Sequence, residues 1–113
     1  MGNERHIEKI KALAEKKKID KVLKYATHKD AELRVAAANA LGTLPADESY
    51  NQLVLMTRDE ELSVRKAAVV ALGVMGRKAG ADHVRHVMTH DTDAELIELC
   101  KTAVAQIVNS TSR

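Results

Sequence analysis

Aromatic residues are nearly absent from this sequence of 113 residues, which contains no tryptophan, no phenylalanine and only two tyrosines. A hydrophobic core must therefore be packed from alanine, valine, leucine, isoleucine and methionine, a composition that suits helices lying close together. The same shortage removes the aromatic rings on which single-stranded nucleic acids stack. We therefore do not expect nucleic acid as the partner, and we interpret the basic run Lys16-Lys17-Lys18 as a solvated turn that ends a helix.

The chain also lacks disulfide partners and long apolar runs. Its single cysteine excludes an intrachain disulfide and is typical of a reducing compartment. No segment approaches the roughly 18 apolar residues of a membrane span, and the opening MGNERHIEKIK lacks the apolar segment of a secretory signal. We therefore expect a cytoplasmic protein without a membrane partner. Hydrophobic residues (45%) and charged residues (30%) are balanced as in a folded domain.

The net charge of +2 is unevenly distributed along the chain. Residues 1–34 contain ten Lys or Arg and six Asp or Glu, a net charge of +4. Residues 35–113 contain eight and ten, a net charge of −2. The basic end points weakly to an acidic partner, although a solvated face made of good helix formers is the simpler interpretation.

An internal repeat runs through most of the chain. Residues 33–42 read LRVAAANALG and residues 64–73 read VRKAAVVALG, at an offset of 31 residues. A diverged third copy follows at an offset of 32, and a short motif that starts with threonine and ends with aspartate precedes each copy. Repeats of this length are typical of solenoids. The third copy includes Leu96, Cys100, Ala103 and Val104, and the motifs are Thr27-His28-Lys29-Asp30, Thr57-Arg58-Asp59 and Thr89-His90-Asp91.

Each repeat has the pattern of two helices, with apolar residues at helical spacing and Pro45, Gly76 and Gly80 between units. We predict an all-α fold, an α-α superhelix: a short right-handed solenoid of about three helix pairs plus an N-terminal capping helix. First helices are expected near 19–28, 47–57 and 80–89, and second helices near 31–44, 61–75 and 93–109. The single domain 1–113 then consists of the cap helix 4–17, the repeats 19–44, 46–75 and 79–109, and the tail 110–113.

Two glycines occur in otherwise good second helices. Gly42 and Gly73 each cost roughly 1 kcal/mol relative to alanine. Close approach of the next helix would offset this cost, whereas Ala105, at the matching position of the third copy, has no next neighbour. The middle second helix, residues 65–75, is apolar all round and is expected to be the best buried.

The motif of aspartate, Val-Arg, Ala-Ala and Ala-Leu-Gly resembles the HEAT-like repeat of short bacterial and archaeal proteins, in the subdivision called phycobilisome-lyase-type. The resemblance covers residues 19–109. It implies a binding scaffold whose partner lies on the concave face formed by the second helices. Such an assignment by family concerns architecture more than activity.

The resemblance also implies a polar ladder in which the aspartate of a turn pairs with the arginine of the following helix. Asp30 with Arg34, and Asp59 with Arg65, fit that role. The third repeat has Ile97 where the arginine is expected, so its part of the ladder is incomplete.

No arrangement of residues indicates catalysis, and we predict neither an enzyme nor a cofactor. The HEAT-repeat deoxyhypusine hydroxylases hold iron through His-Glu pairs at the starts of second helices, where this chain has Val35-Ala36 and Lys66-Ala67. The iron ligands are therefore missing. Cys100 aligns with Ala37 and Ala68 and is expected to be a small buried hydrophobe.

Three histidines are the remaining candidates for metal chemistry. His83, His86 and His90 are spaced so that one side of a helix could present their imidazoles to a metal. Valines and a methionine take the buried side of this helix, which leaves the histidines on an exposed flank. We predict no metal site and leave metal binding at these histidines as the alternative.

The second helices provide the better candidate surface. The residues of the first such helix that are expected to face inward are Leu33, Ala36, Ala37, Ala40 and Leu41. Positions between them then point away from the core and line the concave face. We predict a non-catalytic protein-protein interaction module with an unknown protein partner, and a homodimer as a further expectation. The alternatives are an accessory subunit of a bilin-lyase-type enzyme and a weak nucleic-acid binder, and Ala38, Val69 and Val70 could instead pack against flanking helices. The partner-binding candidates are Val35, Asn39, Lys66, Val70, Glu98 and Lys101.

Overall fold

The structure is a computed structural model that describes residues 2–111 of the chain. The described residues form seven α-helices and no strand. In chain order the helices are α1 (Glu4–Glu15), α2 (Ile19–Tyr25), α3 (Ala31–Leu41), α4 (Asp47–Met56), α5 (Leu62–Met75), α6 (Gly80–His90) and α7 (Ala94–Thr111).

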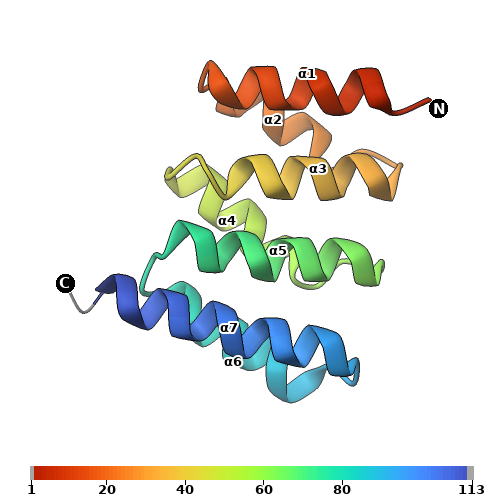
Figure 1. Ribbon diagram of the computed structural model, residues 1–113. Helices are drawn as coiled ribbons and strands as arrows, with labels where there is room; N and C mark the ends of the chain where they lie inside the picture. Colours follow the sequence, from red (N-terminus) through yellow and green to blue (C-terminus); the bar gives the residue numbers. More distant parts are fainter. Residues whose placement is uncertain (1, 112–113) are drawn as a thin grey trace.

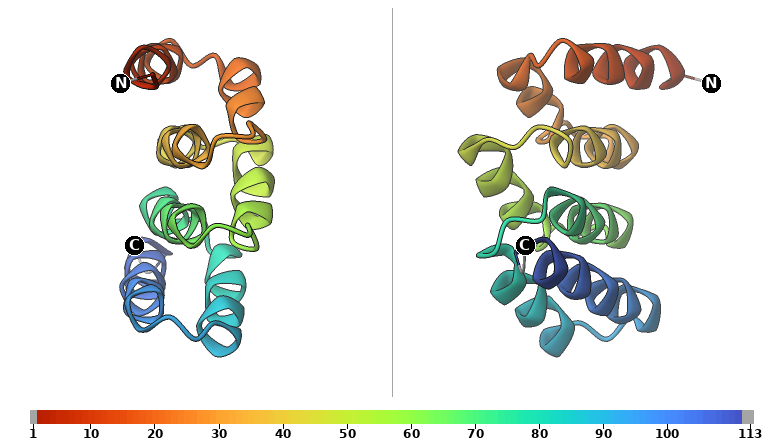
Figure 2. Two further views of the ribbon diagram at one scale, coloured as in Figure 1. Left: turned by 90° about the vertical axis from the view of Figure 1, so that its right-hand side faces the viewer. Right: turned by 60° about the vertical axis from the view of Figure 1, so that its left-hand side comes forward.

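The helices form two layers. The second helices α3, α5 and α7 lie side by side with α1 and run in the same direction (Figure 1). The first helices α2, α4 and α6 form the other layer (Figure 2). The molecule is a slab with extents of 35 × 32 × 18 Å. The predicted α-α superhelix of three helix pairs with an N-terminal capping helix is confirmed.

The helix boundaries follow the predicted ones within three residues, and the largest differences are at the ends of α2 and α3. The cap helix α1 ends at Glu15 rather than at residue 17, and the turn of lysines follows it. The predicted tail 110–113 is partly helical, because α7 continues to Thr111. Residues 112–113 of that tail lie outside the described part of the chain.

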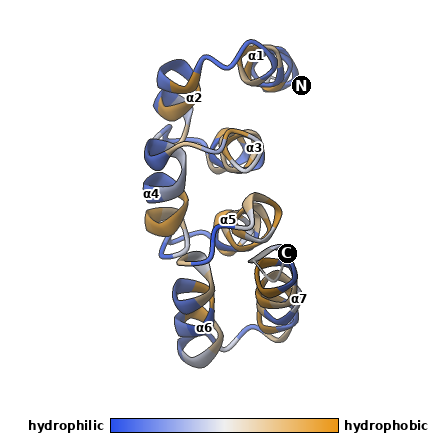
Figure 3. Cartoon of the chain, turned by 90° about the vertical axis from the view of Figure 1, so that its left-hand side faces the viewer, coloured by the Kyte–Doolittle hydropathy of each residue, from blue (hydrophilic) through white to orange (hydrophobic). Residues whose placement is uncertain are grey.

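The core lies between the two layers and is built almost entirely from aliphatic side chains (Figure 3). The central second helix α5 buries Val64, Ala68 and Leu72, spaced four residues apart along one side. Leu96 and Cys100 occupy the first two matching positions in α7 and are also buried. Each fully buried valine, leucine or isoleucine side chain stabilises the fold by about 1.5–3 kcal/mol, so the repeat positions supply most of the driving force for stacking.

Two glycines allow the second helices to approach closely, as predicted. A Cβ atom on Gly42 would lie 2.9 Å from Cβ of Ala71 in α5, and one on Gly73 would lie 3.0 Å from Cα of Ala103 in α7. These separations are too short for carbon atoms. Ala105, which matches the glycines in register, is exposed at the edge of α7.

A polar ladder joins successive turns at the other end of the second helices. Nε and Nη2 of Arg34 donate to the carboxylate of Asp59, each at 3.0 Å, and Nη1 donates to the carbonyl oxygens of His28 and Lys29. Nε of Arg65 donates to Asp91 at 3.0 Å in the same way. Each arginine therefore connects the turn before its own helix to the turn of the next unit.

The predicted pairing within a unit, Asp30 with Arg34 and Asp59 with Arg65, is therefore wrong. Arg65 does contact its own turn, but through the carbonyl oxygen of Asp59 at 3.0 Å rather than through its carboxylate. Asp30 instead accepts from Nδ2 of Asn3 at 2.9 Å and from the amide of Glu32, and so caps α3. Each arginine reaches the carboxylate of the next unit because its side chain extends along the stack and its Nη1 already donates to carbonyl oxygens of its own turn.

The ladder changes the ionisation of its members. Burial alone would raise the pKa of Asp59, but hydrogen bonds from Arg34 and from the Glu61 amide, with the Arg34 charge, lower it overall. The backbone hydrogen bond from Asp93, together with Arg65, lowers the pKa of Asp91. Both carboxylates therefore stay ionised to lower pH in the folded chain than in the unfolded one.

Gly42→Ala is expected to lower the free energy of unfolding by about 1–3 kcal/mol, because the new methyl group would press on backbone and side-chain atoms of Ala71 that cannot rotate away. Urea denaturation measures the change. Gly80→Ala is the matched control, since its Cβ would meet Ile107, Tyr50 and Leu72 at ordinary distances of 3.6 to 3.8 Å. Its effect should stay within about 0.5 kcal/mol. Equal effects of the two substitutions would contradict the close packing of α3 on α5.

Asp59→Asn is expected to lower the free energy of unfolding at neutral pH by about 1–3 kcal/mol, because Arg34 loses a charged partner that is only 14% exposed. The pKa of Asp59 is lower in the folded chain. Its stabilisation is therefore complete above the unfolded pKa of about 4 and disappears as the pH falls through the folded pKa. The variant should lose less stability than the wild type between neutral and acid pH.

The control for this experiment is Asp47→Asn. Asp47 pairs with Arg77 at 2.9 Å but is 84% exposed, so its loss should change stability by no more than about 0.5 kcal/mol. Denaturant titrations at a series of pH values compare the three proteins. A wild-type acid dependence identical to that of Asp59→Asn would contradict the role given to the ladder.

Candidate binding surface

The outer surface of the layer formed by α1, α3, α5 and α7 is shallowly concave. In Figure 2 the two middle helices of this layer, α3 and α5, lie nearer to the first-helix layer than α1 and α7 do. We call this surface the concave face. It is the face that the sequence predicted as the partner-binding side.

Most of the predicted partner-binding residues lie on this face in two matching rows. Val35, Lys66 and Glu98 occupy one register position of the repeat, and Asn39 and Val70 occupy the next. Val35 and Lys66 are half-buried, whereas Asn39 and Glu98 are exposed. Val70 is 39% exposed, which leaves apolar area open to solvent in the middle of the face.

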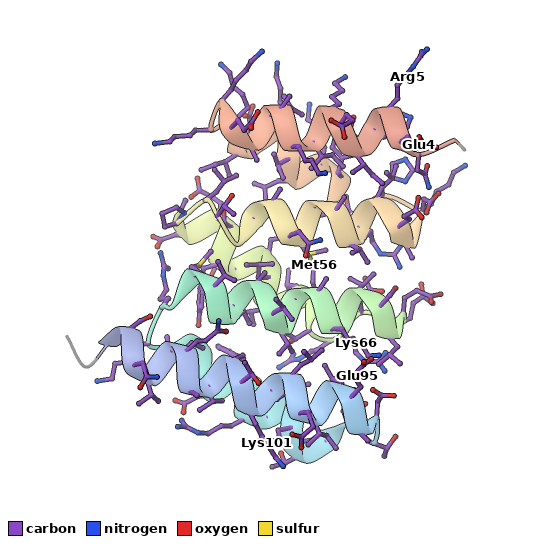
Figure 4. All side chains as sticks on the ribbon, viewed as in Figure 1. Glu4, Arg5, Met56, Lys66, Glu95 and Lys101 are labelled. Carbon is purple, nitrogen blue, oxygen red and sulfur yellow. The ribbon has the colours of Figure 1, made fainter. Side chains whose placement is uncertain are left out.

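Lys66 joins the second and third repeats on this face. Its ammonium group pairs with Glu95 and lies 3.8 Å from Asp93, both at the start of α7. Figure 4 shows Lys66 and Glu95 pointing toward one another between α5 and α7. The hydrogen bond to Glu95 raises the pKa of Lys66. Its charge is thus partly neutralised within the chain.

Lys101 lies at the edge of the stack and not on the concave face. It is in register with Ala38 and Val69, which are fully buried between successive second helices. No further helix follows α7 in the described stack, so the Lys101 side chain is exposed, points away from α5 (Figure 4) and pairs with Glu98 at 2.9 Å. The alternative that Ala38 and Val69 pack against flanking helices is correct for both residues.

An apolar groove opens on the concave face between α1 and α3, with a volume of about 370 Å³. Ala36 and Ala40 of α3 form one wall, and Ile7 and Ala14 of α1 form the other. Ala36 is half-buried, whereas the matching Ala67 of α5 is buried against α3. The capping helix therefore covers α3 less completely than α3 covers α5. The rim is polar and consists of Lys11, Glu15, Asn39 and Thr43.

The sequence did not predict this groove, although Asn39 is one of the predicted partner-binding residues. The feature of the sequence that could have indicated the groove is the small size of the repeat alanines that face the preceding helix. In the full units the preceding repeat helix fills that space, as α3 does for Ala67. The helix that precedes α3 is α1, which belongs to a half-repeat, and its register relative to α3 cannot be read from the repeat itself.

The histidines of α6 do not converge on one point. The rings of His86 and His90 stack with centroids 4.0 Å apart, and Nδ1 of His90 lies 2.9 Å from the carbonyl oxygen of His86. His83 instead packs edge-on against the ring of Tyr50 at 6.2 Å. Among residues 2–111, no group of three or more histidines, cysteines or acidic residues is arranged to hold a metal ion.

Cys100 is a buried core residue, as predicted. Its side chain is fully buried, and burial raises the pKa of its thiol to about 11. A thiol with this pKa is almost entirely protonated at neutral pH and is a poor nucleophile.

Of the helices that the structure describes, none is long and apolar enough to cross a membrane.

The concave face presents a mixture of polar and apolar groups. Lys66 pairs with Glu95 on this face, Val70 leaves apolar area open, and the groove between α1 and α3 has apolar walls and a polar rim. Such a surface resembles the mixed polar and apolar patches through which proteins contact one another.

A comparison with protein-family models matches residues 19–105 to the model described as HEAT repeats. A search among curated proteins gives no significant match. The matched segment begins with α2, ends within α7 and covers well over half of the chain. HEAT repeats are commonly protein-interaction scaffolds and are generally non-catalytic. With its stacked helix pairs, its glycine contacts and its arginine ladder, this chain belongs to the HEAT-repeat family.

Proposed function

We propose that this protein is a non-catalytic interaction module that binds a protein partner on its concave face. The observation that carries the proposal is the apolar area left open there, at Val70 and Val74 of α5 and in the groove between α1 and α3. Val70 is 39% and Val74 58% exposed, and both lie on the helix that is otherwise the most completely covered. Apolar side chains grouped on one exposed face are typical of interaction sites.

The rows on the concave face also support a protein rather than a small ligand. They extend over α3, α5 and α7, whereas a small-molecule site encloses most of its ligand in a concave pocket. Asn39, Lys66 and Glu98 provide donors and acceptors at intervals around the apolar area, as in the polar rim of an interface. Lys101 is removed from the predicted contact set because it lies at the edge of the stack.

Val70→Asp is expected to weaken partner binding about tenfold or more, because a charge at the centre of an interface loses its hydration on binding. Affinity purification from the native cell identifies the partner, and titration calorimetry with the purified partner measures the change. Leu55→Asp is the matched control: Leu55 is 63% exposed on α4, in the opposite layer. If both variants bind the partner with equal affinity, the interface lies elsewhere.

The alternative is an accessory subunit of a bilin-lyase-type enzyme, favoured by the resemblance of the repeat motif to the phycobilisome-lyase-type subdivision. Under the interaction-module proposal, adding the protein to a free bilin is expected to leave the absorption spectrum of the bilin unchanged. The physical reason is that the sole thiol, Cys100, is buried and protonated, and that the groove between α1 and α3 is lined mainly by methyl groups. A saturable shift of the absorption band would instead favour the bilin-lyase assignment.

A further inference from the structure

A second pocket lies at the N-terminal end of the stack, on the other side of α1 from the groove. Its volume is about 430 Å³. We call it the basic pocket. Its lining residues are Lys9 and Leu13 of α1, Lys21, Lys24 and Tyr25 of α2, and His28 of the following turn.

The lysines of the basic pocket have no carboxylate partners within the described part of the chain. This distinguishes them from Lys11, Lys66 and Lys101, which pair with glutamates. No aspartate or glutamate of residues 2–111 lines the pocket. The lysines also belong to the segment 1–34, whose net charge is +4. Three like charges around one opening repel one another, and an anion placed among them relieves that repulsion.

The floor of the basic pocket is apolar and partly rigid. Leu13 and Tyr25 are both half-buried against the core. The ring of Tyr25 lies between two histidines: it is nearly parallel to the ring of His28, at 18° and 6.3 Å between centroids, and tilted against that of His6, also at 6.3 Å. The Tyr25 ring therefore has two neighbouring histidine rings and presents an apolar surface beside the lysines.

We propose that the basic pocket binds an acidic segment of a partner protein, with carboxylates at the lysines and an apolar side chain against Leu13 and Tyr25. Lysine ammonium groups on flexible stems suit a series of separate carboxylates, whereas bidentate recognition of a phosphate favours the planar fork of arginine. No arginine of the described residues lines the pocket. A purely ionic ligand would leave the apolar floor without a contact. A single tyrosine is too few to stack the bases of a nucleic-acid strand.

The test uses the full chain and a labelled synthetic peptide that repeats the sequence Glu-Glu-Leu-Glu. Fluorescence anisotropy at low and high salt measures its affinity. The peptide is expected to bind, and the double variant Lys21→Glu with Lys24→Glu is expected to weaken binding about tenfold or more, since two attractions become repulsions. A peptide that repeats Glu-Glu-Ser-Glu should bind more weakly, because it offers no apolar contact to Tyr25.

The matched control is the double variant Lys78→Glu with Lys101→Glu, at the other end of the stack. Both double variants change the net charge from +2 to −2, and circular dichroism checks that each remains folded. Equal weakening by the two variants would reduce the effect to net charge and overturn the proposal. So would the absence of peptide binding, or tighter binding of oligothymidylate through the same lysines.

A second copy of the chain is also tested as an occupant. Size-exclusion chromatography of the wild type and of the Lys21→Glu, Lys24→Glu variant compares their oligomeric states. The proposal expects the same state for both proteins. A dimer that is present only in the wild type would assign the basic pocket to self-association and overturn it. None of these lysines lies on the concave face. A failure of the peptide experiment therefore says nothing about the interface proposed on the concave face, which Val70→Asp tests separately.

Discussion

The close contact between successive second helices is the interaction on which the rest of this structure depends. A single helix pair has one apolar side and cannot cover it alone, so it is stable only when the next pair lies on it. Gly42 against Ala71 sets the approach at the end of α3, and Arg34 with Asp59 fixes the start of the same helix. Because these contacts act at opposite ends of one helix, they determine both its distance from α5 and its position along it.

The two ends of the stack differ from its middle in the groups that join one unit to the next. Asn3 connects the capping helix to the start of α3 through Asp30 and Glu32. At the other end Ile97 replaces the ladder arginine and Ala105 replaces the glycine. A further unit placed on α7 would therefore find no guanidinium for its turn and no space for close helix approach.

The repeat period predicted the helix pairs, the glycine contacts and the burial of Cys100, because each depends only on position within a unit. It did not predict the ladder partners, which are 25 residues apart in the first rung and 26 in the second. In the first unit His28 occupies the place of Asp59: its Nδ1 accepts the amide of the residue two positions later, as the carboxylate of Asp59 does. An alignment that matches Asp30 with Asp59 therefore shifts the first turn by two residues from its structural register, in which His28 matches Asp59. Lys101 was misplaced for a related reason, since only the contacts of α5 with α7 reveal which side of α7 faces outward.

The capping helix α1 is the common wall of the groove and the basic pocket. Ile7, Lys11 and Ala14 face the groove, while Lys9 and Leu13 face the pocket. Ile10 lies between the two sides and is the one buried residue of α1. A partner that contacts both surfaces therefore covers α1 from both sides, and its second contact forms at the high effective concentration that the first contact provides. The half-repeat that ends the stack is thus also the element through which the two proposed binding surfaces are linked.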